Sequence, residues 1–289
     1  MEDFNTYCYP GTRYSERMFD LDDQVSLRVI SFEPSTASHN IPIVMVVGLS
    51  TMIESFRDIL VELTKDFPVH YIETREKKSA KIKGRISFDV QAFGMDVVKI
   101  VSMLGVEANN YVLMGYSLGA TAIADCHEYI ESKPKCLLLM EPTPAFHYPK
   151  WSLRLIRFAV PLYFILKPAA KWYLRRFRIN TKEDMEMYLI SSRALDNADP
   201  LKLKNTILAI AGYSVWQRLE TIECPALIVA TSKDGLHDHE DIIRMTNGIK
   251  YAKYLDLETN KRTHDAEMAI VIRNYVNNLE SISYKSDLL

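Results

Sequence analysis

Short runs of consecutive apolar residues recur along the chain, and each run stops at a polar or turn-forming residue. Three of them are Ile43 to Val47, Cys136 to Met140 and Ala226 to Ala230. A strand that is buried on both faces of a sheet has this uninterrupted apolar pattern. Between the runs, apolar residues recur with the spacing of helices that cover a sheet. Strands that alternate with helices predict a parallel sheet with helices on both faces.

The remaining elements follow from the same two patterns. The stretches Arg13 to Phe19 and Val25 to Phe32 predict a hairpin with a turn at Leu21-Asp22-Asp23. Two further short strands are predicted at Val69 to Ile72 and at Tyr251 to Leu257. Helices are predicted at 53–66, 88–104, 120–131, 238–247 and 265–279.

The alternation of strands and helices breaks between residues 143 and 219. This stretch has helical periodicity and no clear strand, so it predicts a helical insertion into the sheet domain. We therefore expect a core domain made of residues 1–142 and 220–289, and a helical cap of residues 143–219. Inserted helices above the carboxyl ends of parallel strands form a lid over a site.

The stretch from Tyr111 to Gly119 is the centre of the predicted site. An apolar run ends there in Gly115-Tyr116-Ser117-Leu118-Gly119, and a predicted helix follows. A Gly-x-Ser-x-Gly pattern between a strand and a helix indicates a sharp turn that lifts the serine hydroxyl above the strand end. Side chains at 115 and 119 would collide with the neighbouring strand and helix, which explains both glycines. The pattern predicts Ser117 as a nucleophile.

An activated serine needs a general base and a group that orients that base. Asp234 follows the strand predicted at 226–230, and His264 follows the strand predicted at 251–257. On these residues and their order, the chain resembles the α/β-hydrolase superfamily with a helical cap, and the resemblance covers nearly the whole chain. It implies an α/β fold with a mostly parallel central sheet. It also implies Ser117 as nucleophile, His264 as general acid and base, and Asp234 as its orienting acid.

Glu141 is the competing acid, because it stands directly after the strand predicted at Cys136 to Met140. Haloalkane dehalogenase relatives keep their acid at this place. Those enzymes use Asp as the nucleophile, so Ser117 argues against that reaction here.

The tetrahedral intermediate of acyl transfer needs two N–H donors for its oxyanion. The resemblance implies the backbone N–H groups of Leu118 and of Leu49, which follows the strand predicted at 43–47. The chain departs from the family in this loop, because Val47-Gly48 stands where His-Gly is usual. Ser50 or Thr51 is expected to support the loop instead. The Asp-x-Arg-Gly-x-Gly-like loop of the family is also absent, and residues 73–76 occupy its place.

Composition narrows the class of protein further. The net charge is −2, so no global field favours nucleic acid. None of the four cysteines forms a CxxC pair, and the acidic N-terminus carries no secretory signal, so we expect a cytoplasmic protein. The longest uncharged apolar run, Phe158 to Leu166, is too short to span a bilayer. His237-Asp238-His239 is a weak metal pattern, and we expect neither a metal nor a cofactor.

The segment Lys150 to Lys182 is basic and aromatic. It holds nine Lys or Arg and no Asp or Glu, together with seven aromatic residues. An ordinary lid with a solvated basic face is one interpretation. The others are contact with an anionic membrane surface, which would make the protein peripheral to the membrane, or with an acidic partner such as an acyl carrier protein. We expect Tyr116, Trp151 and Trp172 to bind substrate.

These features predict a serine hydrolase that cleaves a hydrophobic carboxylic ester or thioester through an acyl-enzyme. An acyltransferase with the same three residues is one alternative, because an alcohol or thiol can replace water. A non-catalytic binding protein on the same fold is the other, because a fold does not imply a function.

Overall fold

The structure is a computed structural model, and it describes residues 3–35, 41–178, 185–233 and 238–286. Its centre is a nine-stranded sheet with the order β1-β2-β4-β3-β6-β7-β8-β9, and β5 pairs with β2 at the side. The pairs β1–β2, β2–β4 and β2–β5 are antiparallel, and all pairs from β4 to β9 are parallel. The strands are β1 Arg13–Asp20, β2 Val25–Glu33, β3 Ile43–Val46, β4 Val69–Ile72, β5 Lys81–Ile82, β6 Val112–Tyr116, β7 Cys136–Met140, β8 Ala226–Ala230 and β9 Ala252–Asp256.

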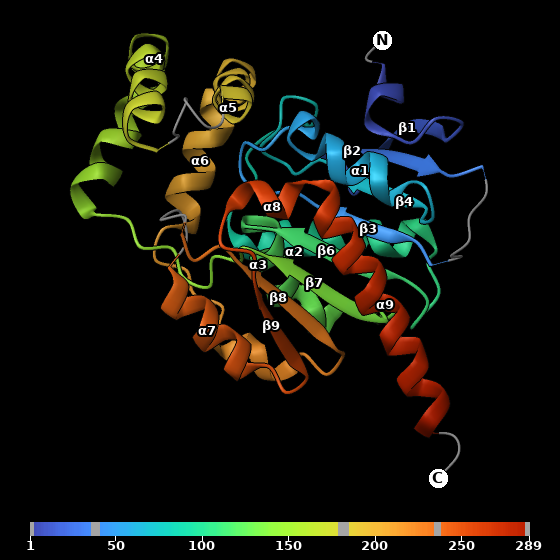
Figure 1. The fold of residues 1–289 in the computed structure, drawn as a ribbon. Coiled ribbons are helices and arrows are strands. Elements are labelled where there is room, and N and C mark those ends of the chain that lie inside the picture. The colour runs from blue at the N-terminus through green and yellow to red at the C-terminus, as the bar shows by residue number, and fades with distance from the viewer. Residues whose placement is uncertain (1–2, 36–40, 179–184, 234–237, 287–289) are drawn as a thin grey trace.

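Helices cover both faces of the sheet, as the alternating pattern predicts (Figure 1). Every residue of β3, β6, β7 and β8 is buried, so their uninterrupted apolar sequences fit a two-sided burial. The helices of the sheet domain are α1 Arg57–Leu63, α2 Val90–Leu104, α3 Leu118–Cys126, α7 His239–Gly248, α8 Asn260–His264 and α9 Ala266–Ser286. Short 3-10 helices occur at η1 Phe4–Tyr7, η2 Ile53–Phe56, η3 His127–Tyr129 and η5 Trp216–Thr221. The predicted fold class is therefore confirmed.

Alternate side chains of the central strand β6 enter two separate apolar cores. Val112 and Met114 pack on the side covered by α1 and α9, whereas Leu113 packs on the side covered by α2, α3 and α7. This is the period of two that a strand imposes on its side chains. The sheet holds β6 between β3 and β7, so the residue that follows β6 lies at the centre of the sheet edge.

Between β7 and β8, the described part of the chain is mostly helical, with one isolated bridge between Ala145 and Ser214 and the short helix η5 close to β8. The other elements of this segment are α4 Lys150–Tyr173, the π-helix η4 Leu174–Arg178, α5 Met185–Asn197 and α6 Pro200–Ile210. Figure 1 shows α4, α5 and α6 standing together beside the sheet domain. The two chain segments that join them to the sheet domain pair with each other, since Phe146 N–H donates to Tyr213 O and Gly212 N–H donates to Phe146 O. We refer to α4, η4, α5 and α6 as the inserted helices.

Candidate active site

Ser117 occupies the sharp turn between β6 and α3. Its φ of 48° and ψ of −116° place a residue with a side chain in a sparsely populated backbone region. Ser117 N–H donates to Met140 O at 2.9 Å, so the neighbouring strand β7 helps to hold the turn. Strained backbone of this kind persists only where the surroundings enforce it, and it is concentrated at functional sites.

The two glycines of the turn permit a close approach that any side chain would block. A Cβ atom on Gly119 would lie 2.5 Å from Val46 O and 2.7 Å from Val47 O. A Cβ atom on Gly115 would lie 2.6 Å from Ala120 N. The expected collision with the neighbouring strand and helix is therefore confirmed.

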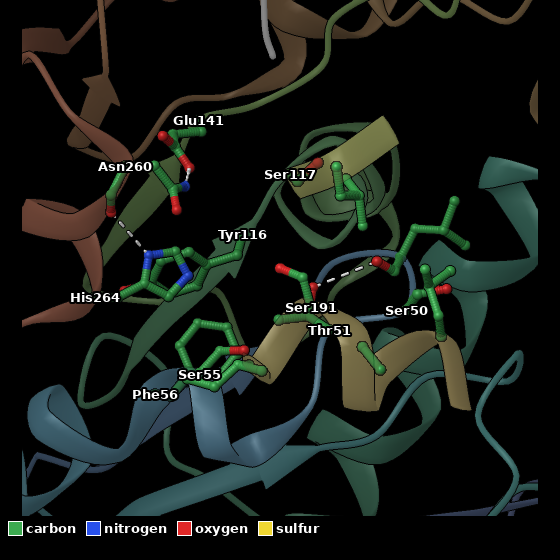
Figure 2. A pocket seen from close by; sticks show the side chains of 15 residues that line it. Ser50, Thr51, Ser55, Phe56, Tyr116, Ser117, Glu141, Ser191, Asn260 and His264 are labelled. Atoms are coloured by element: carbon green, nitrogen blue, oxygen red, sulfur yellow. Dashed lines mark hydrogen bonds between the residues drawn. The ribbon is translucent and has the colours of Figure 1, made fainter. Parts of the chain in front are cut away.

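A cavity of about 380 Å³ opens above Ser117 (Figure 2). The sheet domain supplies its floor and walls: the loop after β3, the turn after β6, Glu141 after β7, and Asn260 and His264 of α8. Parallel strands end at one edge of a sheet, so residues that follow β3, β6 and β7 converge there. In the view of Figure 2, His264, Asn260 and Glu141 lie on one side of Ser117, and Ser50 and Thr51 on the other.

The inserted helices close the cavity from the opposite direction. They contribute Leu174, Ile190, Ala194 and Leu195, which are apolar, together with Ser191. The lining is therefore mostly apolar away from the polar groups at the strand ends. This combination is typical of a site for a small, largely hydrophobic molecule.

His264 lies at the end of α8 with its ring against two aromatic rings. Its centroid is 4.9 Å from that of Phe56, in a stacked arrangement, and 5.0 Å from that of Tyr116. Its Nδ1 lies 3.0 Å from the backbone oxygen of Asn260. Thr263 Oγ1 lies 2.9 Å from the same nitrogen and donates to Asn260 O at 2.7 Å, so it can accept from Nδ1. Both contacts fit a neutral ring with its proton on Nδ1 and with Nε2 as an acceptor. Burial lowers the pKa of His264 to about 4, so the ring is neutral at pH 7.

Glu141 is a buried carboxylate that lines the same cavity. It is 3% exposed and has a positive φ of 47°. Its two carboxylate oxygens accept hydrogen bonds from Thr231 Oγ1 and Asn260 Nδ2, each at 2.5 Å. Asn260 thus contacts Glu141 with its side chain and His264 with its backbone oxygen. Asp234, the acid expected from the resemblance, lies outside the described residues.

The two expected oxyanion donors come from different segments of the chain: Leu118 directly follows Ser117, and Leu49 belongs to the loop after β3. Leu118 is the first residue of α3, and the first N–H groups of a helix have no partner within it. Leu49 lines the cavity from the loop after β3. Gly48, directly before it, lies close to the serine, because a Cβ there would be 3.2 Å from Ser117 Cβ.

The loop after β3 is held by one side chain that the sequence led us to expect and by two that it did not. Thr51 Oγ1 contacts Leu49 O at 3.4 Å, as the expectation for Ser50 or Thr51 allows. The charged side chains of Glu76 and Lys77 reach the same loop, with Ser50 N–H 3.2 Å from Glu76 Oε1 and Lys77 Nζ 2.9 Å from Gly48 O. No local pattern in the sequence signals these contacts, because they form between segments 26 to 29 positions apart.

The three residues expected to bind substrate differ in position. Tyr116 lines the cavity, and its hydroxyl donates to Thr263 O at 2.8 Å. Trp151 and Trp172 are 67% and 61% exposed on α4, and neither belongs to the residues that line this cavity. The structure therefore brings Ser117, His264, Leu49, Tyr116 and Glu141 together and places the two tryptophans on the outer surface.

A scan against models of protein families found no match, and a search of curated proteins also found none. Many solved structures match in fold. A hydrolase from Pseudomonas aeruginosa PA01 has a TM-score of 0.72 and 15% identity, with 92% of this chain and 98% of that chain covered. The enol-lactonase from Burkholderia xenovorans LB400 has a TM-score of 0.71 and 16% identity, with 88% and 97% covered.

An esterase from Exiguobacterium antarcticum matches to the same degree, with a TM-score of 0.71 and 15% identity over 92% of this chain and 100% of that one. Sequence identities this low carry information about the fold alone. The strand order, the turn at Ser117 and these matches agree: the chain has the α/β-hydrolase fold. The resemblance identified from the sequence is confirmed at this level.

The substitution Gly119→Ala tests the close approach between α3 and β3. The new methyl group would meet two backbone oxygens, which cannot move aside, so we expect a loss of unfolding free energy of about 1–3 kcal/mol. Gly248→Ala is the matched control, because the nearest atom to its Cβ is Leu219 Cδ1 at 2.9 Å, the end of a flexible side chain. Urea unfolding measures both, and equal midpoints would contradict the steric explanation.

Proposed function

We propose that this protein is a serine hydrolase that cleaves a small carboxylic ester or thioester with a hydrophobic acyl part. One observation carries the proposal: the strained Ser117 and the neutral His264 face a single apolar-lined cavity. A serine hydroxyl is a weak nucleophile by itself and needs a neighbouring base that is unprotonated at working pH. His264 meets that requirement because its pKa lies far below 7.

The proposed reaction follows the general course of acyl transfer to serine. Ser117 Oγ attacks the carbonyl carbon while His264 Nε2 takes the hydroxyl proton. The negative charge moves to the carbonyl oxygen, where the N–H groups of Leu49 and Leu118 donate to it. His264 then gives its proton to the leaving alcohol or thiol. Water, deprotonated by His264, then attacks the acyl-enzyme. The bond between the acyl carbon and Ser117 Oγ breaks, His264 returns the proton to Oγ, and the acid is released.

The lining of the cavity favours a hydrophobic acyl part. Leu174, Ile190 and Leu195 of the inserted helices face the serine across a volume of about 380 Å³. Transfer of apolar surface from water into such a lining contributes roughly 25 cal/mol per Å². Two of the structural matches are an esterase and an enol-lactonase, and both names fit the same reaction class. In this proposal the inserted helices act as a cap of residues 143–219 over the site.

Two carboxylates compete for the role of orienting His264. Asp234 has the position that the resemblance assigns to the acid. Glu141 is supported by an indirect link in the described residues, since Asn260 donates to its carboxylate from Nδ2 and contacts His264 Nδ1 with its backbone oxygen. We retain Asp234 as the proposed acid, because the resemblance assigns it this role, and Glu141 as the alternative. The two assignments predict different effects of substitution.

Replacing the nucleophile tests the proposal. Ser117→Ala should reduce kcat for p-nitrophenyl butyrate by ~10⁴–10⁶, because the variant has no hydroxyl at the strained turn to form the acyl-enzyme. Ser191→Ala removes a hydroxyl from the same cavity and should cost far less. Both variants should unfold at wild-type temperature. Near wild-type turnover by folded Ser117→Ala would rule out the mechanism.

A comparison of Asp234→Asn with Glu141→Gln identifies the acid. Asp234→Asn should lower kcat by ~10²–10⁴, because the amide disturbs the tautomer of His264. Glu141→Gln should lower it much less. Thermal unfolding of each variant separates a catalytic loss from a structural one, which matters for the buried Glu141. The opposite ranking of the two folded variants would transfer the role to Glu141.

The exposed face of α4 supports a further proposal about partners. Trp151, Leu155, Trp172 and Tyr173 are all more than half exposed there. Arg154, Arg157, Arg175 and Arg176 are also exposed, on α4 and the adjoining η4. Aromatic rings and basic side chains on one helical surface fit the boundary between lipid headgroups and acyl chains. We therefore propose that this face contacts an anionic bilayer; an acidic acyl carrier is the competing partner. None of the described helices contains a stretch long and apolar enough to cross a membrane.

Charge reversal on this face tests the contact. Arg175→Glu combined with Arg176→Glu should weaken sedimentation with phosphatidylcholine–phosphatidylserine vesicles, and added salt should weaken binding of the wild type. Lys250→Glu combined with Lys253→Glu changes the same charge elsewhere on the surface and should leave binding intact. Equal vesicle binding by the two double variants would contradict the contact. Binding only to an acidic carrier protein would identify the competing partner.

A further inference from the structure

The loop after β3 is held in a tight turn beside the catalytic serine. Thr51 N–H donates to Gly48 O at 3.3 Å, and Ser50 in the middle of the turn has a positive φ of 55°. Leu49, whose N–H is a proposed oxyanion donor, lies between Gly48 and Ser50. The direction of that N–H depends on how the two flanking residues are fixed.

Two adjacent charged residues, Glu76 and Lys77, fix the loop from outside the cavity. Lys77 Nζ donates to Gly48 O at 2.9 Å, and Ser50 N–H donates to Glu76 Oε1 at 3.2 Å. The two side chains also form an ion pair, with Lys77 Nζ 2.7 Å from Glu76 Oε1. Glu76 is only 3% exposed, so water screens these interactions weakly. Lys77 thus contacts the carbonyl oxygen of the residue before Leu49, and Glu76 contacts the N–H group of the residue after it.

The contact with Gly48 O acts directly on the Leu49 N–H. Gly48 C=O and Leu49 N–H belong to one peptide unit, and the described residues contain no cis peptide bond. In a planar trans peptide the C=O and N–H point in opposite directions. Holding Gly48 O toward Lys77 thus turns the Leu49 N–H away from Lys77. A cation on the oxygen also polarises the amide, which strengthens its N–H as a hydrogen-bond donor.

We propose that Lys77 is a positioning residue of the oxyanion hole, which sets the direction and donor strength of the Leu49 N–H. This inference rests on the proposed hydrolase function. Lys77 would perform the task left open by Val47, which stands where the family resemblance places a histidine. Lys77 is not among the residues that line the cavity above Ser117, so this positioning requires no contact with the substrate.

Lys77 is itself anchored by an inserted helix. Lys202 of α6 donates from Nζ to Lys77 O and to Ala80 O, both at 2.8 Å. Burial lowers the pKa of Lys202, an effect that the nearby carboxylates of Asp199 and Glu76 oppose. A continuous path of hydrogen bonds thus runs from α6 through Lys77 to the peptide unit of the oxyanion donor. The inserted helices contribute to the geometry of the site as well as to its walls.

Lys78 provides a matched control. It is the next residue in the chain and carries the same charge, but it is exposed and reaches Asp196 O at 3.5 Å rather than the loop after β3. A general effect of removing positive charge near the site would appear in both Lys→Met variants. An effect through the Gly48–Leu49 peptide unit would appear only at Lys77.

The test measures kcat and KM for p-nitrophenyl butyrate in Lys77→Met, Lys77→Gln, Lys77→Arg and Lys78→Met. Loss of a whole oxyanion donor costs ~10²–10³ in kcat, and Lys77→Met leaves the donor in place but misdirected, so we expect a loss of about 10- to 100-fold. KM should change little, because the donor acts on the developing charge. Lys77→Gln should fall between Met and wild type, Lys77→Arg should retain most activity, and Lys78→Met should match wild type.

A second readout does not depend on catalysis. The backbone amide resonance of Leu49 should shift in Lys77→Met and in Lys77→Gln, and should stay in place in Lys78→Met. If Lys77→Met does not fold, Lys77→Gln carries the comparison. Equal kcat and an unmoved Leu49 amide in a folded Lys77 variant would overturn the proposal. Absence of Ser117-dependent hydrolysis in the wild type would instead overturn the proposed function, and this inference with it.

Discussion

The contact between the start of α3 and the end of β3 is the constraint on which the site depends. It is possible because Gly119 has no side chain to meet the oxygens of Val46 and Val47. With α3 this close, the chain must leave β6 through the strained conformation of Ser117. The same approach brings the first N–H of α3 near the loop that follows β3. The positions of the proposed nucleophile and of the proposed oxyanion donors thus share one cause, the packing of a helix on a neighbouring strand.

Strain is concentrated at the carboxyl ends of three central strands. Ser50, Ser117 and Glu141 follow β3, β6 and β7, and all three have positive φ values of 55°, 48° and 47°. Conformations of this kind cost of order 1–3 kcal/mol each. The fully buried strands β3, β6 and β7 supply the packing that can sustain such a cost. The polar groups of the cavity therefore lie close to the ends of buried strands, which favours a preorganised site.

Much of the fold could be predicted because burial imposes simple patterns on sequence. The strands 69–72, 136–140 and 226–230 have the predicted bounds, since their apolar runs stop where the sheet stops. The turn at Ser117 could be predicted because its glycines are a steric necessity. Helix ends were less predictable: residues 53–66 begin with a 3-10 turn, and the helix expected at 265–279 runs from Ala266 to Ser286, after the separate short helix α8. Local sequence does not determine such ends, because tertiary packing decides them.

The site itself was predictable only in part. Glu76 and Lys77 carry no recognisable pattern, since their proposed role depends on contacts with Gly48 and Ser50 across the fold. Trp151 and Trp172 were expected to bind substrate, yet both are exposed on α4 and neither lines the cavity above Ser117. Amphipathic periodicity cannot tell which face of a helix covers a cavity. The role of Asp234 stays a prediction.

The most direct test of the account is covalent labelling with a fluorophosphonate, followed by peptide mass spectrometry. An activated serine attacks phosphorus, fluoride leaves, and the phosphonate ester stays on the protein. The account predicts one adduct per chain, on Ser117, formed much more slowly in a folded His264→Asn variant. Labelling of another residue, or none in the folded wild type, would contradict the assignment of Ser117 as the nucleophile.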